Sequence, residues 1–225
     1  MKALITTITL LVCLSLNSYA QLSLDGQIRP RAEYRDGYRM LPSAETDAAA
    51  QINQRTRLSL SYDFENSVSS RISIQDLRIW GEQMTLGTEP SFGLHEAWVR
   101  LELNERLSLQ AGRQELAYDN QRLMSVNDWS LSARSHDAIV FRRQTENSGL
   151  HIGAAFSQDQ DRLFGTEYGL NNYKTLNYIW YNTRISPILE TSFHLIADGY
   201  ENPDDPDELN VRLSWASYVI IGNGD

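Results

Sequence analysis

The sequence predicts an all-β fold, an antiparallel transmembrane β-barrel of the outer-membrane type with about ten strands. Three observations support this prediction. Long segments alternate apolar and polar residues, the connections between them alternate between short and long, and an export signal precedes the first segment. Ten strands could close a narrow barrel or form the N-terminal part of a longer one, and the sequence leaves both open.

The first strand, expected over 22–35, has two opposite faces. A strand that crosses a bilayer needs about 9–11 residues, apolar toward lipid and polar toward the interior. The apolar side carries Leu22, Leu24, Gly26, Ile28, Pro30, Ala32 and Tyr34, and the polar side carries Asp25, Gln27, Arg29, Arg31, Glu33 and Arg35.

The remaining strands follow the same period of two. The short connections between strands resemble periplasmic turns and the long ones extracellular loops, which places the N-terminus in the periplasm. The strands are expected at 22–35, 51–64, 68–80, 95–103, 106–116, 135–143, 149–157, 173–184, 189–197 and 208–219. The phase changes near 76–80, which suggests a β-bulge there.

The N-terminus reads as a cleavable signal peptide over 1–20, followed by one barrel domain over 21–225. Lys2 supplies the positive start, 4–16 the apolar run, and Ser18-Tyr19-Ala20 the cleavage pattern. Cys13, the only cysteine, would leave with the signal, so no disulfide is expected. The protein is therefore expected in the bacterial outer membrane.

Composition narrows the possible partners. The formal net charge of −9 makes nucleic acid an improbable one. The basic residues are 18 arginines and 2 lysines. Arginine binds carboxylates through a planar, two-point fork, whereas lysine acts as a point charge.

Aromatic residues gather toward the strand ends, as in the aromatic girdles of membrane barrels. Core packing is the alternative interpretation. The residues are Tyr34, Tyr62, Phe64, Trp80, Tyr173, Tyr178, Trp180, Tyr181, Trp215 and Tyr218.

Several motifs resemble the bacterial alginate export family of outer-membrane β-barrel porins. The longest is Gly112-Arg113-Gln114-Glu115-Leu116-Ala117-Tyr118-Asp119-Asn120-Gln121-Arg122-Leu123. The others, which follow in order, are 75–81, 95–99, 128–129, 134–138 and 178–181, so the resemblance runs from about Gly26 to about Trp215. Members of the family are considerably longer than this chain, which suggests that the chain is the N-terminal portion of a longer barrel.

The resemblance implies a monomeric barrel with an arginine-rich lumen that lets an acidic polysaccharide such as alginate, or related anions, leave the cell. It implies periplasmic secretion partners and contact with outer-membrane lipid and lipopolysaccharide. It implies no enzymatic activity, cofactor or metal.

Arginines expected to face the lumen are the candidate substrate-binding residues, because rings of arginine in a pore favour anions. The alternative is that they neutralise lumen acids such as Glu33, Asp76 and Glu96. The candidates are Arg29, Arg31, Arg55, Arg57, Arg71, Arg78 and Arg100, with Arg113 and Arg122 near a strand end and a loop.

Two long connections have open roles. The 117–134 loop either folds inward and constricts the pore or lies on the surface. The acidic stretch over 198–208 either binds calcium or is a solvated outer loop, and it lacks the order of an EF-hand.

Other functions have weaker support in the sequence. Ser135-His136-Asp137 is not a catalytic triad, because adjacent strand residues point to opposite faces. The alternatives to an anion exporter are a general diffusion porin for small nutrients, a barrel-embedded lipase and a non-conducting structural barrel. The sequence offers no serine–histidine set for the lipase.

Overall fold

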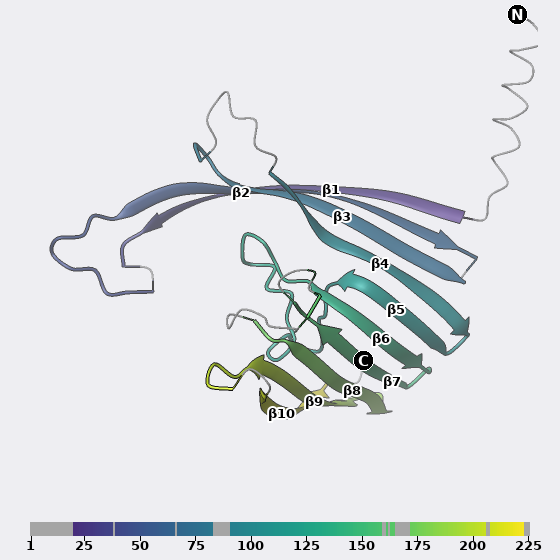
Figure 1. Cartoon of the computed structure of the whole chain (residues 1–225). Coiled ribbons are helices and arrows are strands. Elements are labelled where there is room, and N and C mark those ends of the chain that lie inside the picture. Colours follow the sequence, from purple (N-terminus) through teal and green to yellow (C-terminus); the bar gives the residue numbers. More distant parts are fainter. Residues whose placement is uncertain are drawn as a thin grey trace, which may run out of the picture.

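The computed structural model describes residues 20–37, 39–65, 67–82, 91–158, 161, 163–164, 172–205 and 208–222. They form one antiparallel sheet of ten strands in chain order, which confirms the predicted fold class (Figure 1). The strands are β1 (Ala20–Arg35), β2 (Ala49–Phe64), β3 (Val68–Ile79), β4 (Phe92–Asn104), β5 (Leu107–Gln114), β6 (His136–Gln144), β7 (Ser148–Phe156), β8 (Thr175–Ser186), β9 (Leu189–Glu201) and β10 (Leu209–Ile221).

The register gives the sheet an outer apolar face and an inner polar face. Leu24 lies opposite Leu60, and Leu58 lies opposite Ile74, so these side chains share the outer face. Arg57 lies opposite Gln27 and, on its other side, Gln75 on the inner face. Because paired residues point to the same side, the alternation read from the sequence is carried from strand to strand.

The connections separate into two ends of the sheet. The links at 105–106, 145–147 and 187–188 lie at the end where β1 begins, called here the short-turn end. The long connections gather at the opposite end, called the long-loop end (Figure 1). The predicted alternation is therefore present.

The β-bulge lies elsewhere than expected. The pairing of β2 with β3 runs without a shift to Ile79, whereas the pairing of β3 with β4 shifts between Ser73 and Ile74. Across that shift β4 skips His95. Two successive side chains, His95 and Glu96, are consequently buried, which a strict period of two cannot produce.

The aromatic residues divide between the two faces. Tyr34, Tyr62 and Trp80 are exposed on the outer face, as an aromatic girdle requires. The girdle prediction is wrong for Tyr178 and Trp180, which lie on the inner face opposite Gly153 and His151. It is also wrong for Tyr218, which shares the inner face with Ser192, and Tyr173 lies in the connection before β8.

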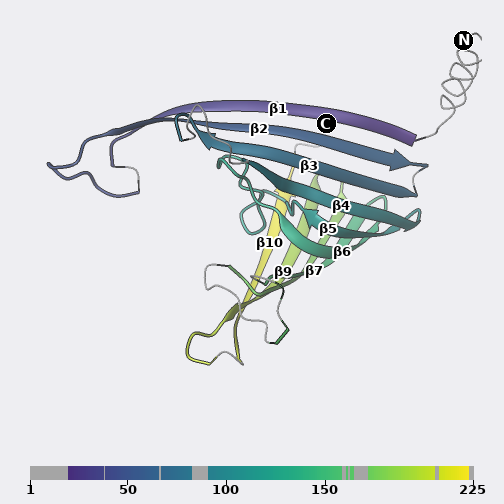
Figure 2. The same cartoon turned by 45° about the horizontal axis from the view of Figure 1, so that its top comes forward.

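The ten strands do not close into a barrel. Within the described part of the chain, β1 and β10 make no contact, and each has one unpaired edge. The sheet curves strongly, so that β7, β9 and β10 run steeply to β1–β3 (Figure 2). No described segment forms a helix long and apolar enough to span a membrane. The expected signal peptide lies outside the described residues, apart from Ala20.

Substitution of Ile28, in the middle of β1, by arginine tests which face of the sheet contacts lipid. Ile28 is 73% exposed on the outer face. We expect Ile28→Arg to lower the free energy of unfolding by about 2–4 kcal/mol in lipid vesicles, because a charged residue at mid-bilayer is costly on the lipid face. Ser23→Arg, on the inner face of the same strand, is the control. Equal losses in denaturant titrations of the two variants would contradict this assignment.

Candidate functional site

The connection between β5 and β6, residues 115–135, crosses the inner face of the sheet and is called here the crossing loop. Its side chains reach β9 at one end and β1 and β2 at the other. Of the two roles left open by the sequence, the structure therefore shows the inward fold. The loop is the feature around which the candidate site is built.

At one end, Asp128 of the loop binds two arginines of the first hairpin. Its Oδ2 accepts from Arg29 Nη1 at 3.1 Å and its Oδ1 accepts from Arg55 Nη2 at 2.6 Å. Loop carbonyls take further donors: Arg31 Nη1 donates to Trp129 O at 2.6 Å and Arg29 Nη2 to Ser130 O at 2.7 Å. The Asp128 side chain is 52% exposed, so water screens its ion pairs and each contributes about 1 kcal/mol or less.

At the other end, Asp119 is enclosed by three donors on β8 and β9. Asp119 Oδ2 accepts from His194 Nε2 at 2.6 Å and from Ser192 Oγ at 2.7 Å. The indole of Trp180 donates to the same carboxylate, at 3.2 Å to Oδ1. Asp119 has a positive φ of 49°, a conformation that aspartate tolerates better than most residues.

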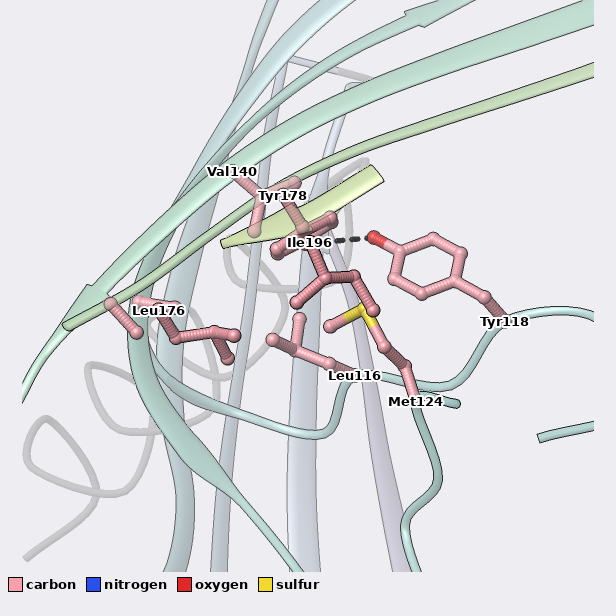
Figure 3. Close-up of a cluster of buried hydrophobic side chains, with 9 residues drawn as sticks. Leu116, Tyr118, Met124, Val140, Leu176, Tyr178 and Ile196 are labelled. Carbon is pink, nitrogen blue, oxygen red and sulfur yellow. Dashed lines mark hydrogen bonds between the residues drawn. The ribbon is translucent and has the colours of Figure 1, made fainter. Parts of the chain in front are cut away.

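Apolar packing fixes the loop beside Asp119. Leu116, Tyr118 and Met124 are buried against inner-face residues that include Val140, Leu176 and Ile196 (Figure 3). The hydroxyl oxygens of Tyr118 and Tyr178 lie 2.8 Å apart, within hydrogen-bond distance (Figure 3). Burial raises the pKa of Tyr118, so its hydroxyl group stays protonated at neutral pH.

The first residue of the crossing loop, Glu115, contacts the β-bulge in β4. His95 Nε2 donates to Glu115 Oε1 at 2.7 Å, and this hydrogen bond lowers the pKa of Glu115. Arg57 lies 3.5 Å from the same oxygen, and Arg71 donates to Glu96 at 2.8 Å. His95, Glu96 and Glu115 are close enough to hold a metal ion, but arginines already neutralise both carboxylates, so we assign no metal here.

Arginines also set the charge state of Asp128. Burial alone would raise its pKa, but the hydrogen bond and charge of Arg55, with the charges of Arg29 and Arg57, lower the pKa below 3.8. The carboxylate that ties the loop to the hairpin is therefore ionised at neutral pH.

Six of the predicted arginines lie on the inner face. Five of them, Arg29, Arg31, Arg55, Arg57 and Arg71, form ion pairs with carboxylates. The sixth, Arg100, donates to Gln110 and lies over the Trp98 ring, 5.3 Å from its centroid.

The predicted inner position is wrong for Arg78 and Arg113. Arg78 lies opposite Gln54 and Arg113 opposite Ala97, both on the outer face. Each is neutralised there by an aspartate, Arg78 by Asp76 at 2.6 Å and Arg113 by Asp137 at 3.0 Å. Both strand positions are near the long-loop end, where polar side chains can reach the membrane interface. The remaining candidate, Arg122, is exposed on the crossing loop.

Sequence reasoning missed Arg142. It lies on the inner face of β6 opposite Ser108 and His151, and within the described residues its side chain forms no ion pair or hydrogen bond. The period of two would have placed it there. Its inner-face neighbour Val140 is apolar, however, which hid the polarity of this face.

The acidic stretch does not form one outer loop. Asp198 is buried on the inner face of β9 and forms an ion pair with Arg212 of β10. Glu201 lies 3.7 Å from Lys174. Asp204 and Asp205 are exposed, and Asp207 lies outside the described residues. The predicted calcium alternative therefore loses two of its carboxylates to basic side chains.

Comparison with known proteins adds the family. A family model described as alginate export matches residues 20–175, more than half of the chain. The chain belongs to the alginate export family. The expected resemblance is confirmed, and no curated protein matches the chain.

The solved structure of OprB supports the fold of this member of the alginate export family. A high-pH structure of OprB of Pseudomonas putida is 11% identical with a TM-score of 0.52, over 89% of this chain and 60% of that chain. OpdL of Pseudomonas aeruginosa is 14% identical with a TM-score of 0.48, over 92% and 57%. The chain therefore spans about 60% of the length of OprB. Family and fold together place the chain in the outer membrane.

The Asp128 end of the crossing loop should be released only at low pH. Docking on the arginines lowers the pKa of Asp128 from its ordinary value of 3.8. The ionised carboxylate therefore stabilises the docked loop fully above pH 3.8, and this stabilisation is lost as the pH falls through the lowered pKa. We expect hydrogen exchange of the amides at 127–132 to stay slow down to pH 3.8 and to rise below it. Asp128→Asn is the control, with fast exchange at every pH. Release of the parent loop near neutral pH would refute this.

A methyl group at Gly153 should disturb the packing of Tyr178. A Cβ at this position would lie 2.2 Å from the Tyr178 ring. We expect Gly153→Ala to displace the ring, weaken its contact with Tyr118 and cost about 1–3 kcal/mol of unfolding free energy. Gly93→Ala, where a Cβ would meet nothing within 4 Å, is the control. Equal effects in denaturant titrations would show that Tyr178 packing is not limiting.

Proposed function

We propose that this sheet forms part of the wall of an outer-membrane pore that passes an acidic polysaccharide such as alginate, or related anions. The family and the fold support a porin of this kind. The chain acts in this proposal as a transporter without a catalytic step, with its short-turn end toward the periplasm and its outer face in contact with lipid and lipopolysaccharide.

The observation that carries anion selectivity is a pair of inner-face arginines without carboxylate partners. Among the described inner-face arginines, Arg100 and Arg142 alone lack one. They flank β5, where Arg100 lies opposite Gln110 and Arg142 opposite Ser108. Unneutralised guanidinium groups in a pore attract anions and offer them two-point hydrogen bonds.

A general diffusion porin for small nutrients is the second candidate. The ion pairs of Arg29, Arg55 and Arg71 favour it, because most of the positive charge on the inner face is cancelled within the protein. The two candidates differ in whether the remaining charge on Arg100 and Arg142 sets the selectivity.

Two adjacent arginines on opposite faces allow a matched test. We expect Arg142→Gln to lower the anion-to-cation permeability ratio, measured from the reversal potential of single channels under a potassium chloride gradient. Arg143→Gln, which removes the same charge from the outer face, should leave the ratio unchanged.

Two results would contradict the selective role. A parent pore without anion preference refutes it directly. Equal effects of Arg142→Gln and Arg143→Gln would show that selectivity depends on the total charge and not on the inner-face site, which favours the diffusion porin.

A further inference from the structure

We propose that Asp128 is a built-in competitor for cargo. In this proposal Arg29 and Arg55 form a carboxylate-binding clamp, the crossing loop fills it with its own carboxylate, and a uronic acid carboxylate displaces Asp128 and releases that end of the loop. The inference rests on the proposed anion pore and adds both a binding site and a means of opening.

The geometry of the clamp fits a carboxylate. The two oxygens of Asp128 are shared between two guanidinium groups, at 3.1 Å from Arg29 and 2.6 Å from Arg55. The two arginines lie opposite each other on β1 and β2. A carboxylate on a sugar ring presents the same pair of oxygens, whereas a neutral sugar offers no charge to compensate the guanidinium groups.

The clamp also has an unused donor. Arg55 is completely buried, its Nε donates to Gln27 and its Nη2 to Asp128. Its Nη1 is buried and has no hydrogen-bond partner in the described part of the chain. An unpaired buried donor on a charged group is costly, so Asp128 leaves the site incompletely satisfied.

The two ends of the loop are held unequally. The Asp128 side chain is 52% exposed, and water and salt screen its ion pairs. The Asp119 side chain is 9% exposed, has three donors, and lies beside the packed residues Leu116 and Tyr118. Arg29, Arg31 and Gln75 also donate to the carbonyls of Ser130, Trp129 and Ser132 at the Asp128 end, but no residue of 127–132 belongs to the buried hydrophobic cluster. The Asp128 end lacks apolar packing and is therefore the one that an external anion can displace, while the Asp119 end stays attached as a pivot.

Loop release can be measured by the distance between two spin labels. One label is placed on the crossing loop by Ser132→Cys and one in the exposed connection before β3 by Ser67→Cys, with Cys13→Ser in the background. The full chain is reconstituted in lipid and titrated with sodium glucuronate, with glucose as the neutral probe. We expect one distance without ligand, a second population that grows with glucuronate, and no change with glucose.

Charge variants test the competitor directly. Asp128→Asn should show the second population without any ligand and bind glucuronate about three- to tenfold more tightly, because the internal competitor is weakened. Asp204→Asn removes the same charge from an exposed site between β9 and β10 and should keep the parent distance.

The outcomes separate this inference from the proposed function. If glucuronate and Asp128→Asn both leave the distance unchanged in a pore that prefers anions, the competitor role is refuted and the anion pore stands. If the loop moves but the channel has no anion preference, the clamp stands as a binding site and the anion pore is refuted. A loop that moves equally with glucose and glucuronate refutes carboxylate recognition.

Discussion

One carboxylate ties together parts of the chain that are far apart in sequence. Asp128 lies between guanidinium groups of β1 and β2, so the crossing loop is fixed to arginines of the first hairpin that lie 99 and 73 residues earlier. A second carboxylate of the loop, Asp119, is fixed to β9. The sheet itself is held by neighbouring ladders only, whereas this loop makes contacts across the concave side. The positions of the crossing loop and of the arginines that it contacts therefore depend on these two attachments.

The charge balance of the inner face follows from the same arrangement. A loop that brings Glu115 and Asp128 onto a basic surface neutralises arginines that would otherwise face the pore. The bulge at His95 also places Glu96 beside Arg71, and the two side chains form an ion pair. Among the described inner-face arginines, only Arg100 and Arg142 are left without an ion pair to a carboxylate, and the loop brings Tyr118 and no acid to the side of β6 where Arg142 lies. The crossing loop thus decides where on the sheet an anion meets free guanidinium groups.

The strands and their order could be predicted because a period of two and alternating connection lengths are properties of consecutive residues. The first strand shows this best, since its two predicted faces are those that its pairing with β2 produces. The wrong face assignments have one cause: a residue type was read as a sign of its face. Arg78 and Arg113 face outward beside aspartates, and Tyr178 faces inward because Gly153 makes room for its ring. The inward path of the loop depends on contacts with β1 and β9, which local sequence does not encode.

The two free edges of the sheet restrict the number of strands that can join β10 to β1. β1 rises from the short-turn end and β10 returns toward it, because ten alternating strands end in the direction opposite to their start. In a bilayer the unpaired backbone groups along both edges need partners, and open edges are not tolerated there. If every new pair is antiparallel, the strands that bridge β10 to β1 must be even in number, whichever chain supplies them. An odd insertion would force one parallel seam into the wall.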